Sequence, residues 1–243
     1  MLIINADDWG KNQKTTDNSL ECYKNNRISS ASAMVFMADS ARAAELATEH
    51  NFDTGLHINF NLNFDGNLVS SRLKLYHQAI ASFLSRNKYN VLIYNPLLKK
   101  EFEYVFQAQY DEFIRLFCKT PTHFDGHRHL HLCMNMVIDS IIPQGMRIRK
   151  NFTFFKGEKS SINIRYRTIL DHWLMKRYLC TDYFFDLAPF NDSSRLQQII
   201  NLSRSFSVEL MVHPERTEEF RYLISEDFQQ LIRQTSTCDY TQF

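Results

Sequence analysis

The sequence has few residues that break or cross-link a chain. Its 243 residues include six glycines and five prolines, so no Gly- or Pro-rich linker divides it. The five cysteines are scattered and contain no Cys-x-x-Cys pair. This spacing argues against a disulfide framework or a thiolate zinc site and favours a reducing compartment. We expect a single domain over residues 1–243.

The sequence also lacks a strong net charge and a long apolar run. Its formal net charge is +1, which gives no overall attraction to nucleic acid. The start, MLIINADD, has neither the basic nor the apolar region of a signal peptide, and no later run could span a membrane. We therefore expect a cytoplasmic protein with no nucleic-acid partner and no transmembrane segment. Peripheral membrane association and a homodimer remain open.

Positive charge is nevertheless concentrated in one segment, residues 146–177. Its acidic residues are Glu158 and Asp171, and its basic residues are Arg147, Arg149, Lys150, Lys156, Lys159, Arg165, Arg167, Lys176 and Arg177. The simpler interpretation, which we favour, is a solvated basic face balanced by the acidic C-terminal third. The alternative is a surface that faces an anionic or membrane-linked substrate.

Apolar patterns of strand and helix alternate along the chain. Strands are predicted at 2–4, 31–37, 55–58, 146–149, 183–187 and 208–212, with a further strand leading into residues 122–131. Helices are predicted at 15–27, 40–50, 100–118, 164–180, 192–204 and 217–235, and the stretch 61–96 looks irregular, with a turn-prone patch at 61–67. The alternation predicts an α/β fold with parallel strands and helical crossovers.

Polar side chains follow these strands where each one ends. They are Asp7 and Asp8, His57, His127, Arg149 and His213. In β/α barrels and in doubly wound sheets alike, functional sites gather at the carboxyl ends of the strands. The placement therefore predicts one active site.

Two carboxylates end the first strand. Asp7 and Asp8 are adjacent on an extended segment, so we expect their side chains to point to opposite sides. One could bind a cation while the other acts as a base beside it. The alternative for Asp8 is that it only caps the following helix.

The stretch THFDGHRHLH, residues 122–131, contains four of the nine histidines. His127 and His131 share a face in a strand and in a helix, whereas His57 alone would more often be a core residue. An aspartate with two imidazoles suits zinc and accommodates other divalent metals, and an open position would serve amide or ester hydrolysis. Asp125 could orient an imidazole or an arginine. His213 could protonate an amine leaving group or merely occupy a turn.

Five ordered motifs carry a resemblance over nearly the whole chain. NADDWG at 5–10, SASAM at 30–34, GLHINF at 55–60, PTHFDGHRHLH at 121–131 and ELMVHPE at 209–215 resemble the motifs of the YdjC/ChbG-like carbohydrate deacetylases. The resemblance implies an irregular TIM-like (β/α) barrel with a mostly parallel sheet. It also implies a metal-dependent hydrolase that removes the acetyl group from an N-acetylated amino sugar.

The resemblance also assigns roles to individual residues. It implies that Asp8, His57 and His127 are ligands of one divalent ion, zinc or magnesium, with Asp7 as general base and His213 as general acid. Further residues near the substrate or behind the ligands would be Asp125, His131, Arg149 and Asn61.

One departure from the family pattern affects specificity. Asn61 stands where a threonine is expected, so the substrate of this chain can differ. Free, oligomeric, nucleotide-linked and lipid-linked sugars all remain open, and the basic segment 146–177 makes an anionic or lipid-linked sugar one option. Two alternative functions also remain: another metallohydrolase, such as a phosphoesterase, and a sugar-binding protein without turnover.

Overall fold

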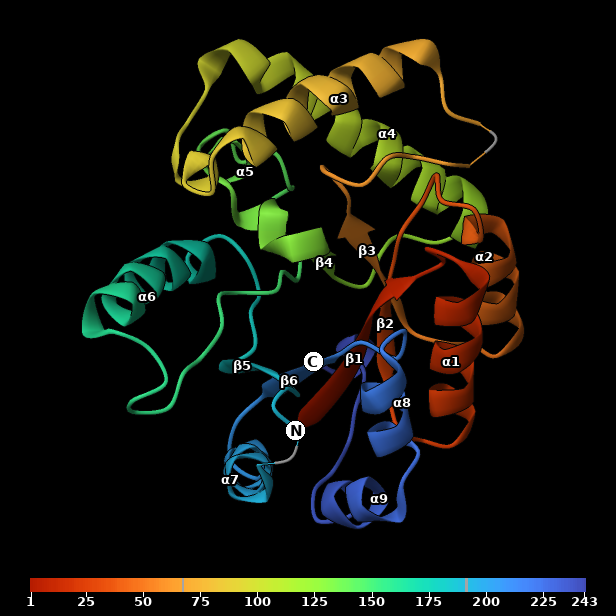
Figure 1. Ribbon diagram of the computed structural model, residues 1–243, viewed down its shortest axis with the longest axis vertical. Helices are drawn as coiled ribbons and strands as arrows, with labels where there is room; N and C mark the ends of the chain where they lie inside the picture. Colours follow the sequence, from red (N-terminus) through yellow and green to blue (C-terminus); the bar gives the residue numbers. More distant parts are fainter. Residues whose placement is uncertain (67, 191) are drawn as a thin grey trace.

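Six parallel strands form one sheet at the centre of the protein (Figure 1). The computed structural model describes residues 1–66, 68–190 and 192–243. The strand order is β4-β3-β2-β1-β6-β5. The strands are β1 (Leu2–Trp9), β2 (Ser30–Ala33), β3 (Thr54–Ile58), β4 (Phe124–Gly126), β5 (Tyr183–Asp186) and β6 (Val208–Val212). The predicted α/β fold with a parallel sheet is confirmed.

The strands are buried because helices cover the outer face of the sheet. All eight residues of β1 are buried, as are all five of β6, and the two strands pair from Leu2↔Val208 to Ala6↔Val212. Parallel sheets covered by helices bury their strands on both faces in this way. Because the strands are parallel, the side chains that follow them meet at one edge.

An irregular segment, residues 145–153, closes the gap between the two edge strands. Phe124 of β4 donates to the Arg147 carbonyl and accepts from the Arg149 amide, while the Thr153 amide donates to Phe184 of β5 at 2.7 Å. The predicted strand at 146–149 is therefore wrong. The segment crosses from one edge to the other and makes only isolated bridges, as at Phe124↔Ile148. The result is a curled sheet that resembles an irregular barrel.

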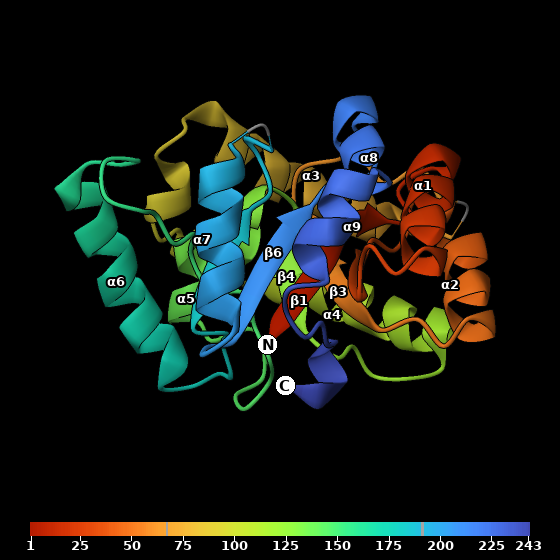
Figure 2. The same ribbon diagram turned by 90° about the horizontal axis from the view of Figure 1, so that it is seen from below.

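Helices surround the sheet (Figures 1 and 2). The longer ones are α1 (Gln13–Lys24), α2 (Ser40–Glu49), α3 (Ser71–Arg86), α4 (Lys99–Phe117), α6 (Ser161–Met175) and α7 (Ser193–Ser203), and the shorter ones are α5 (Met134–Ile138), α8 (Thr217–Leu223) and α9 (Glu226–Ile232). Short 3-10 turns are η1 (Asn90–Leu92), η2 (Pro96–Leu98), η3 (His127–Leu132) and η4 (Tyr240–Gln242). No described helix is long and apolar enough to cross a bilayer.

The stretch 61–96 is not irregular throughout, because it contains α3. The Ser70 hydroxyl caps this helix at the Leu73 amide, and the helix buries Leu73, His77, Ile80 and Leu84. These positions repeat at helical spacing, but His77 hides the apolar pattern. Asn67, part of the predicted turn-prone patch, lies outside the described residues.

Three other predicted boundaries were wrong. The terminal helix breaks into α8 and α9 because the Ser225 hydroxyl accepts from the Phe228 amide and starts a new helix. β2 ends at Ala33 rather than at 37, and α6 ends at Met175 rather than at 180.

Candidate active site

The end of β1 brings both carboxylates to one cavity. The pairing register of β1 with β2 shifts between Ala6 and Trp9, and Asp8 has a left-handed backbone with φ 67°. Such a bulge re-aims side chains, and aspartate tolerates this conformation better than most residues. The expectation that Asp7 and Asp8 face opposite sides was therefore wrong, since both line the same cavity.

Asp8, His57 and His127 form a compact cluster of donor atoms. Oδ1 of Asp8 lies 2.8 Å from Nδ1 of His127 and 3.3 Å from Nε2 of His57. One donor atom from each of the three residues lies within 4.8 Å of the others. Burial disfavours the charged carboxylate, but hydrogen bonds from the two histidines hold the pKa of Asp8 well below its usual value. Two imidazole nitrogens and a carboxylate oxygen fit a zinc ion.

Asp125 of β4 holds His57 from behind. Its Oδ1 lies 2.8 Å from Nδ1 of His57, while its Oδ2 accepts from the Ser32 hydroxyl at 2.7 Å. Burial opposes the charged imidazole, but Asp125 and Asp7 raise the pKa of His57 to about 10. A carboxylate on one ring nitrogen turns the other toward a metal. The negative field that stabilises this imidazolium would also favour a divalent cation.

Arg149 connects the carboxylates beneath the cavity. Its two terminal nitrogens bind both oxygens of Asp7 at 2.7 and 2.8 Å, and Nη1 also lies 2.7 Å from Asp125. Nε donates to Glu209 at 2.6 Å. The guanidinium is fully buried, and its three carboxylate partners outweigh that burial to raise its pKa above the usual value. Arg149 therefore fixes the positions of Asp7 and Asp125 rather than contacting solvent.

His213, after β6, lies on the wall of the same cavity. The cavity has a volume of about 480 Å³ and is lined by Asp7, Asp8, Lys11, His57, His127, Arg128, His129, Phe152, Asp186, Met211, His213, Glu215 and Arg216. The amide of His213 donates to Glu219, which fixes the backbone. Burial lowers the pKa of the imidazole, although Asp7 and Asp8 oppose this. The imidazolium would therefore be a stronger acid than free histidine.

The other histidines of residues 122–131 have separate environments. His123 stacks on Tyr240 with 3.7 Å between ring centroids and lies 3.0 Å from the Ser32 hydroxyl. His131 is buried against the Arg149 carbonyl at 2.9 Å and does not line the cavity, so of the two predicted places, near the substrate or behind the ligands, the structure leaves the second. His129, in contrast, does line the cavity. Left-handed φ values at Arg128 and His129 separate His127 from His131.

Some cavity residues were missed by sequence reasoning. Lys11 bridges Asp8 at 3.3 Å and Glu215 at 2.7 Å, and Asp186 ends β5. The signals for Asp186 and Glu215 were present, since Asp186 lies at the end of one predicted strand and Glu215 follows another. Asn61, in contrast, does not line the cavity and donates its amide to Asn59.

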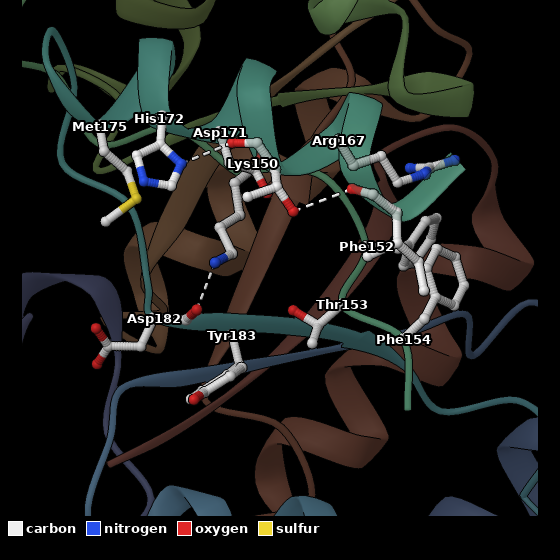
Figure 3. Close-up of a pocket in the computed structure, with 12 residues that line it drawn as sticks. Lys150, Phe152, Thr153, Phe154, Arg167, Asp171, His172, Met175, Asp182 and Tyr183 are labelled. Atoms are coloured by element: carbon white, nitrogen blue, oxygen red, sulfur yellow. Dashed lines mark hydrogen bonds between the residues drawn. The ribbon is translucent and has the colours of Figure 1, made fainter. Parts of the chain in front are cut away.

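A smaller cavity of about 210 Å³ lies on the other side of Phe152, between α6 and β5 (Figure 3). The ammonium of Lys150 points across it and donates to the Asp182 carbonyl. None of the proposed metal ligands lines this cavity. The donor cluster of Asp8, His57 and His127 therefore belongs to the larger cavity.

Comparison with known families identifies the family of this chain. A model of the family described as YdjC-like protein matches residues 1–234. The chain belongs to the YdjC-like family.

Three relatives carry names that describe an activity. The chain is 28% identical over 134 residues to a carbohydrate deacetylase of Danio rerio and 29% identical over 139 residues to one of Homo sapiens. It is 28% identical over 133 residues to a chitooligosaccharide deacetylase of Proteus mirabilis. These matches cover 54% of this chain and 42%, 41% and 50% of the relatives, so the chain spans half or less of their length.

A solved structure shares the fold at low sequence identity. It is a candidate cellobiose-phosphate cleavage protein from Enterococcus faecalis, with a TM-score of 0.70 and 18% identity. The superposition covers 99% of this chain and 97% of the other.

Proposed function

We propose that this protein is a metal-dependent deacetylase that hydrolyses the acetamide of an N-acetylated amino sugar. The observation that carries the proposal is the convergence of Asp8, His57 and His127, with Asp125 behind His57, in a chain of the YdjC-like family. Relatives are named carbohydrate and chitooligosaccharide deacetylases. We also propose that residues 1–243 form a single domain, which contains the whole site.

Asp8, His57 and His127 would hold one divalent ion, zinc or magnesium. Their two nitrogens and one oxygen suit zinc on softness grounds. When bound, the ion would be a Lewis acid that could polarise the amide carbonyl and make water more acidic. Asp125 keeps Nε2 of His57 turned toward Asp8. The remaining steps belong to Asp7, Arg149 and His213.

Asp7 takes a proton from the attacking water. Arg149 binds both of its oxygens and the Asn5 side chain also donates to Oδ1, so Oδ2 keeps a second lone pair for another hydrogen bond. The ion pair fixes the carboxylate beside the donor cluster, since Nε2 of His57 lies 3.9 Å from Asp7 Oδ2.

His213 donates a proton to the sugar nitrogen as the C–N bond breaks, which leaves acetate and a free amine. The lowered pKa makes its imidazolium the stronger donor. Arg149 contacts no solvent, so its part is to position Asp7 and Asp125. Asn61 and His131 have no step in this mechanism.

Acetate release tests the proposal. The purified protein, exchanged into zinc or magnesium, is incubated with N-acetylglucosamine and N-acetylgalactosamine derivatives, and His127→Ala is measured beside it. We expect turnover with the metal and a loss of more than about a hundredfold in the variant. His50→Ala, at the end of α2, serves as the histidine control. Equal rates for wild type and His127→Ala would refute the mechanism, and turnover of phosphate esters instead would favour a phosphoesterase.

A further inference from the structure

An apolar groove adjoins the catalytic cavity. It has a volume of about 310 Å³ and shares Arg128, His129 and Phe152 with that cavity. Its aliphatic lining comes from η1, η3 and α6 and comprises Val91, Leu92, Leu130, Leu132 and Leu170. A molecule with its reacting end at the metal ligands could thus continue into this groove.

Three polar side chains on the α6 side of the groove already have partners. Nε of Arg167 donates to Asn163 at 2.8 Å, and the Asn151 side chain donates to Asp171 at 2.8 Å. A sugar subsite needs polar groups that are free to hydrogen-bond hydroxyls. Because aliphatic side chains dominate and the two amides are already bound to Arg167 and Asp171, the groove suits a hydrocarbon chain better than a sugar.

The rim of the groove exposes large apolar side chains on both sides. On one side, Leu92 and Ile93 are 48% and 50% exposed. On the other side, along α6, Ile162 and Ile169 are 84% and 67% exposed and Tyr166 is 39% exposed. α6 lies at the edge of the molecule, away from α1, α2 and α8 (Figures 1 and 2). We call these five residues the apolar rim.

Positive charge surrounds the α6 side of this rim. Its exposed or half-exposed basic residues are Lys156, Lys159, Arg165, Lys176 and Arg177. The two acidic residues nearby are engaged, since Glu158 accepts from Arg195 at 2.8 Å and Asp171 accepts from Asn151. Apolar side chains flanked by lysine and arginine are characteristic of surfaces that bind anionic membranes. A second copy would present the same positive charge and be repelled.

Arg128 lies where the groove meets the catalytic cavity. Its side chain is exposed, and no carboxylate of the described residues lies within ion-pair distance of it. A guanidinium in this position could bind a phosphate between a sugar in the cavity and a chain in the groove.

We propose that the apolar rim docks this protein on an anionic membrane and that its substrate is an N-acetylated amino sugar linked through phosphate to a hydrocarbon chain. The sugar occupies the catalytic cavity, the phosphate binds Arg128, and the first part of the chain lies in the apolar groove. The substrate assignment rests on the proposed deacetylase function, whereas the membrane docking does not.

Vesicle flotation tests the docking without any turnover. The full chain is mixed with vesicles of phosphatidylcholine alone or with added phosphatidylglycerol. We expect binding only to the anionic vesicles, weakened at least about tenfold by Ile162→Ser/Ile169→Ser and by high salt. Leu75→Ser on α3, 63% exposed, is the matched control and should bind as wild type does. No binding to anionic vesicles, or equal binding by the double variant, would overturn the docking.

Acetate release tests the substrate class. N-acetylglucosaminyl phosphate carrying a long prenyl chain in detergent is compared with the same compound carrying a methyl group. We expect KM to be at least about tenfold lower for the long chain, and Leu92→Asp to raise KM for that compound alone. Equal KM values for the two compounds would overturn this inference. Acetate release from them would still support the proposed function. Lower KM values for longer soluble oligosaccharides would instead identify a sugar chain as the occupant, and no acetate from any substrate would refute the proposed function itself.

Discussion

At the scale of single residues, Arg149 and Asp125 determine how the site is arranged. Arg149 sits between Asp7, Asp125 and Glu209, and Asp125 links it to His57. A buried guanidinium with several carboxylates is strongly held in place, because removing one partner leaves an uncompensated charge. The proposed ligands and the proposed base are thus positioned by one shared network.

Asp125→Asn should weaken metal binding. The amide cannot replace the charge that orients His57 and pairs with Arg149, so we expect metal affinity to fall about 10- to 100-fold. Competition with a fluorescent zinc chelator measures this. Asp53→Asn is the control, since Asp53 is another buried carboxylate that accepts from Ser30 at 2.7 Å, outside the cavity. Equal zinc affinities for the Asp125 variant and wild type would contradict the role of Asp125.

At the scale of elements, the contact of β3 with His123 depends on a glycine. A Cβ added at Gly55 would lie 2.4 Å from the His123 ring, which is itself stacked on Tyr240. The close approach leaves no room for a side chain at this point of β3. Gly55 therefore allows the His123 ring to pack directly against β3.

Gly55→Ala should destabilise the protein by about 1–3 kcal/mol, because the ring must shift within a packed interior. Urea denaturation of the variant measures the change in the free energy of unfolding. A double-mutant cycle with His123→Ala is the control: if the clash with this ring is the cause, the two effects will not add. Additive effects would show that the cost arises elsewhere.

At the scale of the whole molecule, several neutral histidines in the interior should make the fold sensitive to acid. Burial lowers the pKa of His77, His123 and His131 to about 4 each. Between pH 6.5 and 4 the unfolded chain binds protons at these positions and the folded chain does not. The free energy of unfolding therefore falls as the pH decreases through this range.

His77→Phe should reduce this acid sensitivity. The imidazole packs against Phe64 at 4.3 Å between centroids, so a phenyl ring is close in shape. From pH 6.5 toward 4, the stability of the variant relative to wild type should rise by up to roughly 1.4 kcal/mol per pH unit. Urea denaturation at a series of pH values tests this, and parallel stability profiles would count against it.

Metal removal should lower the Tm of the whole protein. An ion that binds only the folded chain stabilises it, by about 2.7 kcal/mol at a hundredfold excess over Kd. We expect a chelator to lower the Tm and added zinc to restore it, with His127→Ala responding to neither. A wild-type Tm indifferent to chelator and zinc would mean that the histidine cluster is structural.

The sequence alone determined much of the fold and the composition of the site. Alternating apolar patterns predicted β3, β6 and the parallel sheet, and polar residues after the strands predicted one shared site. The family resemblance was confirmed, while the roles of Asp7, Asp8, His57, His127 and His213 stay predictions. Local pattern was sufficient for the strands because burial imposes it on each segment separately.

Only the tertiary structure decided which side chains meet. The bulge at Asp8 and the left-handed residues Arg128 and His129 cannot be read from a repeat, because they break it. The partners of Arg149 lie 24 to 142 positions away in the chain, at Asp125, Glu209 and Asp7. Contacts over such separations follow from how the strands are ordered and how the segment 145–153 crosses between the edges. Long-range electrostatic pairing is therefore a property of the folded sheet, whereas the residues that take part were visible in the sequence.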